Sequence, residues 1–137
     1  MPEKRGYDRH AIQAKVWFSL EQDTKKTISG EVVDISFLGW GGLLNENIDV
    51  GTLIEFDLSV DFLEEHLLGK GQIVHVTELN TSEGKSFRVG VKFIEVKSEI
   101  VLDFIQINKR RIDRELREAI EAKRKKEQTG PKDVGAF

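Results

Sequence analysis

Apolar and polar residues alternate in five stretches of the first 96 residues. The cleanest is 11–20, where the even positions are apolar and the odd positions are mostly polar. The alternation returns in 28–35, 52–60, 71–77 and 86–96. Because successive side chains of a strand point to opposite faces, each stretch predicts a β-strand with one buried face.

The last two stretches are separated by 80–85, Asn-Thr-Ser-Glu-Gly-Lys, which are turn-forming residues. We therefore expect these two strands to form a hairpin. Residues 61–68 leave a helical turn and an extended connection both open. Several short alternating strands at this spacing favour an antiparallel sandwich or a small barrel, so the predicted fold class is mainly β.

The hydrophobic period changes after Val96. Ser98 is a good N-cap, and apolar residues then recur at helical spacing, which predicts an amphipathic helix over 98–127. This helix would run ~40 Å at 1.5 Å per residue, more than a small barrel can cover. Its far end must project, pack on another copy or fray. Residues 128–131, Gln-Thr-Gly-Pro, are expected to stop it and to leave 128–137 as a flexible tail.

Charge is distributed unevenly along the 137 residues, although the net charge is only -3. Residues 16–96 hold six basic and fourteen acidic side chains, whereas 97–127 hold ten basic and seven acidic. Residues 1–15 are also net basic. The predicted body is therefore acidic and carries a basic arm and a basic helix, and no bulk charge for duplex nucleic acid is present.

Several classes of chemistry find no support in the composition. There is no cysteine, which removes disulfides, thiolate catalysis and cysteine-ligated metals. The three histidines show no metal-binding spacing, and no serine lies in a nucleophile-elbow context, so we expect neither a metal site nor an enzyme. No apolar run approaches the ~20 residues of a membrane span, so a cytoplasmic protein without a membrane span is expected.

Two short motifs offer the chemistry of a nucleotide site. Arg5 and Arg9 stand four residues apart, and Asp34, Ser36 and Gly39 lie in the segment Asp-Ile-Ser-Phe-Leu-Gly. The planar fork of arginine matches phosphate oxygens and the O6/N7 edge of guanine. A carboxylate accepts hydrogen bonds from guanine N1 and N2, and a serine hydroxyl both donates and accepts. Together these groups suit a guanine nucleotide.

The order RxxxR then DxSxxG, followed by predicted strands, resembles the PilZ family of bacterial cyclic di-GMP receptors over about residues 4–96. Residues 90–93, Gly-Val-Lys-Phe, resemble a late strand of that family, and 11–18 lie where its first strand belongs. The segment Trp-Gly-Gly at 40–42 departs from the family pattern.

The resemblance implies a PilZ-like antiparallel β-barrel of about six strands over 11–97, a flexible arm over 1–10 and a long C-terminal helix. It also implies cyclic di-GMP as the ligand. The implied ligand contacts are Arg5, Arg9, Asp34, Ser36 and Gly39, and the additional candidate contacts are Lys4, His10 and Trp40.

Two of these residues keep alternative interpretations. Trp40 could stack on a base or close one end of the barrel, and packing is the commoner role for a tryptophan. Gly39 could adopt a positive φ in a tight turn or let the backbone approach a flat base.

At the level of function, we expect a cyclic di-GMP receptor whose arm becomes ordered on binding and which signals to a protein partner in trans. The alternative is a PilZ-like structural adaptor that forms a homo-oligomer through 98–127 and binds nucleotide weakly or not at all. Helix positions 101, 105, 108, 112, 116 and 119 approximate coiled-coil spacing, although Asn108 interrupts them. An RNA-binding barrel is disfavoured because the strands offer no basic aromatic platform.

Overall fold

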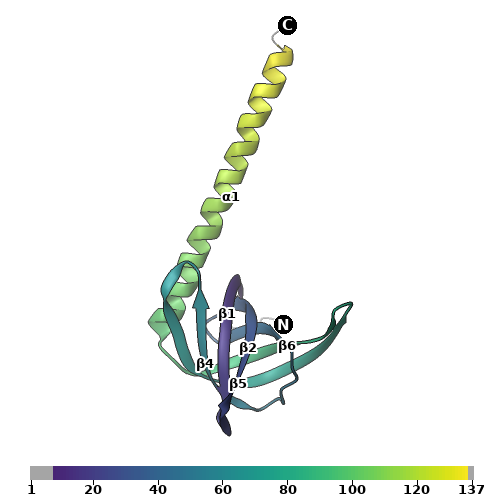
Figure 1. Ribbon diagram of the computed structural model, residues 1–137. Coiled ribbons are helices and arrows are strands. Elements are labelled where there is room, and N and C mark those ends of the chain that lie inside the picture. The colour runs from purple at the N-terminus through teal and green to yellow at the C-terminus, as the bar shows by residue number, and fades with distance from the viewer. Residues whose placement is uncertain (1–7, 136–137) are drawn as a thin grey trace.

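The computed structural model describes the backbone of residues 8–135 and the side chains of residues 8–124. Six antiparallel strands close into a barrel in the order β1-β2-β3-β6-β5-β4, and a long helix projects from it (Figure 1). The elements are β1 (His10–Leu20), β2 (Asp23–Ile35), β3 (Gly39–Leu44), β4 (Leu53–Val60), β5 (Leu63–Thr81), β6 (Gly84–Val96) and α1 (Ser98–Gly135). The predicted fold class, mainly β with an antiparallel barrel of about six strands and a long C-terminal helix, is confirmed.

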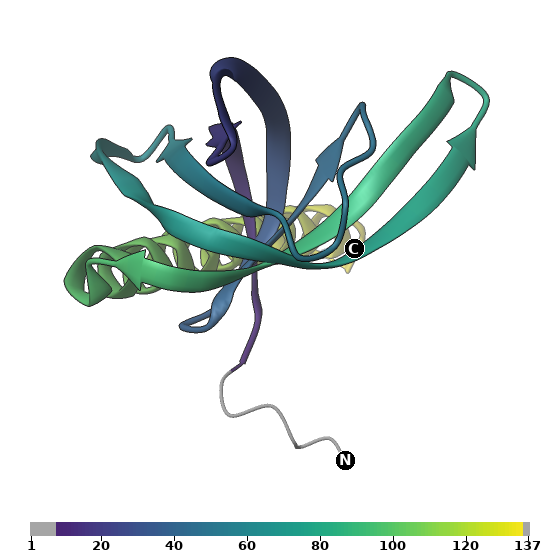
Figure 2. The ribbon, with the colours of Figure 1, turned by 90° about the horizontal axis from the view of Figure 1, so that it is seen from below.

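The alternating strands bury the face that the sequence predicts. In β1 the side chains of Ile12, Ala14, Val16 and Phe18 are buried between exposed neighbours. The strand pairs with β2 on one side and with β4 on the other, and this second pairing closes the barrel. The predicted β5–β6 hairpin is also confirmed, and its outer end reaches away from the barrel (Figure 2).

Two strand segments were not anticipated. The first part of β5 occupies 63–68, so the extended alternative for this stretch is the correct one. Strand β3 begins at Gly39 and includes Gly41 and Gly42, whose lack of side chains hides any alternation. A Cβ atom on Gly42 would lie 2.6 Å from the carbonyl oxygen of Glu31 on β2. The close approach of β2 and β3 therefore requires a glycine at position 42. A glycine adds nothing to an alternation of apolar and polar side chains, so this alternation could not indicate β3.

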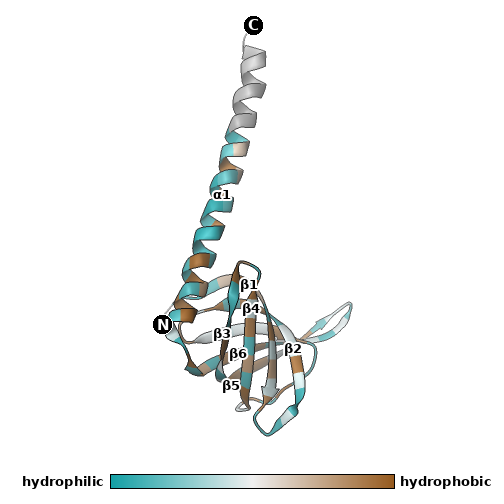
Figure 3. Ribbon diagram, turned by 60° about the vertical axis from the view of Figure 1, so that its left-hand side comes forward, coloured by the Kyte–Doolittle hydropathy of each residue, from teal (hydrophilic) through white to brown (hydrophobic). Residues whose placement is uncertain are grey.

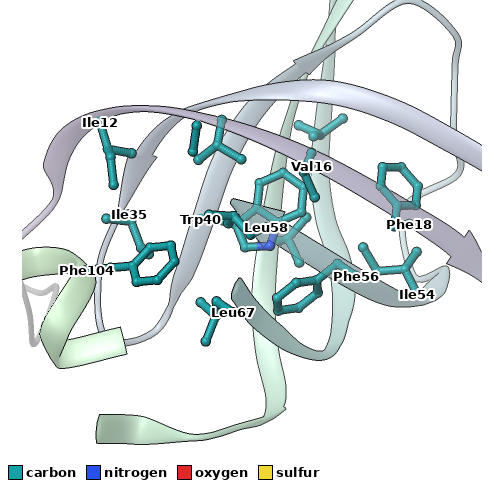
Figure 4. Close-up of a cluster of buried hydrophobic side chains, with 14 of the residues drawn as sticks. Ile12, Val16, Phe18, Ile35, Trp40, Ile54, Phe56, Leu58, Leu67 and Phe104 are labelled. Atoms are coloured by element: carbon teal, nitrogen blue, oxygen red, sulfur yellow. The ribbon is translucent and has the colours of Figure 1, made fainter. Parts of the chain in front are cut away.

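The core lies inside the barrel and is built largely from the inward side chains of the strands (Figure 4). Trp40 is only 1% exposed, and its ring packs edge to face against Phe56 with the ring centroids 5.9 Å apart. Phe93 extends this aromatic group at 5.9 Å from Phe56. Burial of such rings contributes several kilocalories per mole to folding, so they anchor the barrel.

The first turns of α1 cover one end of the barrel. Val101, Phe104 and Ile105 are buried in the same core as the strands. Asn108 is also buried, and its Nδ2 donates a hydrogen bond to the carbonyl oxygen of Ala11 at 2.8 Å. Beyond this point the helix leaves the barrel, and in Figure 3 the hydrophobic residues of its first turns give way to mostly hydrophilic ones along the coloured part of the helix.

The helix is longer than we predicted. It continues through Gly130 and Pro131 and ends at Gly135, whereas the sequence indicated an end at 127 and a tail over 128–137. A proline inside a helix loses one backbone hydrogen bond and crowds the carbonyl four residues before it, at a cost of about 3 kcal/mol, so a Gly-Pro pair weakens this helix without ending it. No helix within 8–135 combines the length and the apolar character needed to cross a membrane.

Candidate functional site

The carboxylate of Asp34 lies between two arginines. Its Oδ1 accepts a hydrogen bond from Arg9 Nη1 at 2.7 Å, and its Oδ2 accepts one from Arg88 Nη2 at 2.7 Å. The Asp34 side chain is 15% exposed, whereas those of Arg9 and Arg88 are 45% and 40% exposed. A largely enclosed anion thus holds two cations whose outer surfaces remain open to solvent.

Strand pairing places this group. Asp34 is opposite Gly41 in the β2–β3 pairing, and Gly41 is opposite Gly90 in the β3–β6 pairing. A Cβ atom on Gly41 would stand 2.8 Å from Asp34 Oδ1 and 3.3 Å from Arg88 Nη2. The absence of a side chain at Gly41 therefore lets the two charged groups meet across β3.

Arg88 is a member of the Asp34 group that the sequence did not indicate. It lies on the polar face of the alternating stretch 86–96, which is the ordinary place for a solvated arginine. Its proximity to Asp34 depends on β3, which lies between them and which was not predicted. Arg88 Nε is buried and has no hydrogen-bond partner within the described part of the chain.

The turn after Asp34 is held by its own polar groups. Ser36 N donates to the carbonyl oxygen of Gly39 at 2.8 Å, and Ser36 Oγ accepts from Leu38 N at 3.1 Å. The turn is joined to β6 because Phe93 N donates to the carbonyl oxygen of Leu38 at 2.8 Å. Ser36 is only 4% exposed, so its hydroxyl shapes the turn, and its O–H hydrogen is still a donor.

One of the two alternatives for Gly39 can be decided. Positive φ values within the described residues occur only at Gly51 and Gly84, so the alternative with a positive φ at Gly39 is wrong, whereas a close approach of its backbone to a base stays a prediction. A Cβ atom at Gly39 would collide with the carbonyl oxygen of Val91 on β6. The glycine therefore permits close packing of two strands.

A pocket of about 230 Å³ opens beside the Asp34 group. Its lining includes Arg9 from the first segment of the chain, Ser36 and Gly39 from the turn, and Lys92 from β6. Arg9 of the first motif and Ser36 and Gly39 of the second, which are distant in the chain, therefore meet at one place. A larger hollow of about 620 Å³ lies elsewhere, between Trp17 and Leu68, but it contains none of the motif residues and we do not assign the site there.

The remaining candidate contacts have different outcomes. Trp40 is enclosed in the core, in agreement with the packing interpretation, and stacking of its ring on a base stays a prediction. His10 is half-buried at the start of β1, opposite Ile35 of β2. Lys4 and Arg5 lie outside the described residues. Among the side chains of residues 8–124, no group of carboxylates and histidines has the arrangement of a metal site.

Comparisons with known proteins agree with this geometry. The model of the PilZ domain family matches residues 3–106. No curated protein sequence gives a significant match.

Among solved structures, the PilZ domain of YcgR from Escherichia coli with c-di-GMP has a TM-score of 0.62 at 17% identity, covering 86% of this chain and 98% of that one. The Bacillus subtilis inhibitor of motility MotI/DgrA has a TM-score of 0.61 at 15% identity, covering 78% and 50%. The K. pneumonia MrkH–c-di-GMP complex has a TM-score of 0.59 at 14% identity, covering 88% and 55%.

The chain spans about half the length of MotI/DgrA and of MrkH, and nearly all of the isolated YcgR domain. Residues 3–106, which the family model matches, include all six strands and the Asp34 group. Because the family model matches well over half of the sequence, including both motifs, this chain belongs to the PilZ domain family.

Proposed function

We propose that this protein is a receptor for cyclic di-GMP, bound at the pocket beside Asp34. The observation that carries the proposal is the meeting of Arg9, Ser36 and Gly39 around one pocket, next to the carboxylate of Asp34. The YcgR and MrkH structures that resemble this chain contain c-di-GMP. Arg9, Arg88 and Lys92 supply three cations against one carboxylate, which suits a ligand with two phosphodiester charges.

Each residue has a role that follows from its chemistry. Arg9 binds a phosphate or the O6/N7 edge of a guanine, because its fork presents two parallel donors. Asp34 accepts from N1 and N2 of a guanine, and Ser36 donates its O–H hydrogen. Arg88 keeps Asp34 oriented from the opposite side. Arg5, Lys4 and His10 add contacts from the arm in this proposal.

Binding requires an exchange of partners at Asp34. Its Oδ1 is occupied by Arg9 in the free protein, so a guanine can reach this oxygen only when Arg9 turns away. An ion pair as exposed as this one is worth about 0–1 kcal/mol, so its loss is easily offset by new ligand contacts. Arg88 prevents the carboxylate from being left unpaired during the exchange.

Signalling in this proposal follows from order in the arm. Ligand contacts to Arg9 and Arg5 fix residues 1–10 against the barrel, and the new surface is recognised by a protein partner in trans. Coupling through the ordering of a segment is a common form of switch, and it needs no chemical reaction. The protein acts as a binding module and not as an enzyme.

Titration calorimetry with cyclic di-GMP tests the receptor function. We expect Arg9→Ala and Asp34→Ala each to weaken binding about a hundredfold, since loss of a charged hydrogen bond costs ~2–3 kcal/mol. Matched controls are Arg110→Ala and Asp103→Ala, which remove exposed side chains of α1. Cyclic di-AMP serves as the competitor that lacks the guanine edge. Absence of binding by the unmodified protein would overturn the receptor function.

A second candidate function, the oligomeric adaptor, is favoured by one feature of α1. Ile112, Leu116 and Ile120 are 39%, 59% and 48% exposed and follow one another at intervals of four residues. Part of the stripe that we assigned to a coiled coil is used elsewhere, because Val101, Ile105 and Asn108 are buried at the barrel. Only the projecting part of the helix is therefore free to pair.

The charges beside this stripe favour an antiparallel pair of helices. Asp113, Arg117 and Leu116 line the same shallow hollow on the helix. In an antiparallel pair centred near Leu116, Ile112 faces Ile120 of the second copy and Asp113 comes close to Arg117 of the second copy. A parallel pair gives no such match, because Asp113 then lies at the same height as Asp113 of the second copy, and Arg117 at the same height as Arg117.

Sedimentation equilibrium of charge-exchange variants tests this candidate. Asp113→Arg and Arg117→Asp should each lower the fraction of dimer, and the double variant should restore it. Circular dichroism checks that all three remain helical. A monomer at every concentration of the unmodified protein would remove the adaptor candidate.

A further inference from the structure

The binding site and the base of α1 meet at one residue of β1. Ala11 lies opposite Asp34 in the β1–β2 pairing, and it is two residues from Arg9. The carbonyl oxygen of Ala11 accepts the hydrogen bond from Asn108 Nδ2 of α1 at 2.8 Å. One backbone position therefore joins the carboxylate site to the helix.

Asn108 is part of a larger set of contacts at the base of the helix. It is only 1% exposed, and its Oδ1 accepts a hydrogen bond from Arg111 Nη2 at 3.2 Å. The Arg111 guanidinium lies over the ring of Phe62, 5.2 Å from the ring centroid. Phe62 belongs to the connection between β4 and β5. A shift at Ala11 would leave a buried amide unpaired and disturb this whole set.

Apolar packing makes a second connection between the same segments. Ile12 follows Ala11 and Ile35 follows Asp34, and both are buried. In Figure 4 the ring of Phe104 from α1 points toward Ile35, with Ile12 beside them. The helix and both strands therefore contribute to one buried cluster at residues next to the site.

An irregularity of register sets the start of β1 apart from the rest of the strand. The β1–β2 register is irregular between Ala11 and Ala14, whereas the pairs from Ala14 onward are continuous as far as Ser19. Residues 9–11 are thus separated by this irregularity from the rigid part of the strand. A change in the partner of Arg9 can displace them while the rest of the ladder stays in place.

We propose that α1 is the output element of the site: a change at Arg9 and Asp34 alters the Asn108–Ala11 hydrogen bond and thereby the hold of the barrel on the helix. The identity of the effector rests on the proposed function, whereas the link itself is a property of the chain. Because coupling free energy is reciprocal, weakening the helix contact also alters nucleotide affinity.

Hydrogen exchange of the backbone amides of 101–108 tests the link without nucleotide. Asp34→Ala should speed this exchange about fivefold, the lower end of typical coupling. Asn108→Leu should also speed it, and the double variant should exchange no faster than Asn108→Leu alone. The matched control is Asp57→Ala, which removes an exposed carboxylate paired with His66 on the barrel at 2.7 Å. Unchanged exchange in Asp34→Ala, or simple addition in the double variant, would overturn the link.

The same measurement with cyclic di-GMP separates the two proposals. Nucleotide should change the exchange of 101–108 in the unmodified protein and leave it unchanged in Asn108→Leu. The affinity of Asn108→Leu should differ about fivefold from that of Gln106→Leu, which replaces an exposed amide on the same helix. Binding without any effect on 101–108 would overturn the output role. No binding in calorimetry would overturn the receptor function, and the nucleotide-free experiment still decides the link.

Discussion

Arg88 lies 54 residues after Asp34 in the chain, and yet its Nη2 donates to Asp34 Oδ2 at 2.7 Å across β3. This contact joins the second motif to a strand that neither motif includes. It keeps one oxygen of Asp34 engaged while the other faces Arg9. The consequences of this arrangement can be measured residue by residue.

Replacement of Arg88 should weaken cyclic di-GMP binding in the proposed receptor. Arg88→Ala leaves Asp34 held from one side only, and we expect a loss of ~1–3 kcal/mol in titration calorimetry, about tenfold to a hundredfold. Arg88→Lys should recover only part of this, because an ammonium lacks the planar fork. Lys85→Ala is the control, since Lys85 lies in the outer part of the β5–β6 hairpin. Equal affinity of Arg88→Ala and the unmodified protein would contradict a role for Arg88.

A single methyl group at Gly41 should disturb the site while the barrel still folds. In Gly41→Ala the new Cβ would stand 2.8 Å from Asp34 Oδ1, so the carboxylate must move away from its arginines. We expect the affinity for cyclic di-GMP to fall at least tenfold, with a far-ultraviolet spectrum like that of the unmodified protein. Gly51→Ala is the control for an alanine that meets no neighbouring group, because nothing lies within 4 Å of its Cβ. Its φ of +96° strains the backbone of an alanine. It should lose about 1 kcal/mol of stability and keep its affinity.

Trp40 should matter for stability and not for direct contact with nucleotide. Trp40→Ala removes a ring that is 1% exposed, and we expect it to lower the free energy of unfolding by ~3–5 kcal/mol in urea denaturation. Trp40→Phe should cost less, because an aromatic ring remains against Phe56. Quenching of tryptophan emission by iodide should report mainly Trp17, which is 42% exposed. An unchanged affinity of Trp40→Phe for cyclic di-GMP would agree with the packing role. A lower affinity with an unchanged free energy of unfolding would contradict it.

Truncation should show that α1 has two parts. A chain that ends after Arg111 keeps Val101, Phe104 and Asn108 in place, so we expect its melting temperature to stay close to that of the full chain. A chain that ends after Lys97 exposes the surface that Val101, Phe104 and Ile105 cover, each worth ~1.5–3 kcal/mol. Calorimetric melting should therefore show a large loss of stability for the shorter chain alone. Similar melting of both truncated chains would contradict this division.

The sequence predicted the elements that have one buried face and one solvent-exposed face, because such elements show a regular period of apolar and polar residues. β1 and β4 alternate clearly because each lies between core and solvent, and the helix period is visible because its first turns cover the core. β3 was not predicted because its glycines are required by close contacts with the backbones of β2 and β6. Such contacts between distant segments leave no periodic pattern in the local sequence. The end of α1 was misplaced because a Gly-Pro pair lowers helix stability without prescribing an end.

The site could be predicted only in part. The turn within the DxSxxG segment is local, since Ser36 N donates to the carbonyl oxygen of Gly39, and local sequence is enough to suggest this turn. Arg88 could not be found, because its meeting with Asp34 needs the register of three strands. Asn108 was taken for a polar interruption of a coiled coil, whereas its amide is paired with β1. The roles of Arg88 and Asn108 both depend on hydrogen bonds to residues far away in the sequence.

The projecting helix also has a mechanical consequence. From Asn108 to Gly135 it extends ~40 Å beyond its seat on the barrel, at 1.5 Å per residue. A tilt of only about 10° at that seat would carry the far end through ~7 Å, on the same helical rise. A displacement too small to alter the barrel is thereby amplified into one that a neighbouring protein can detect.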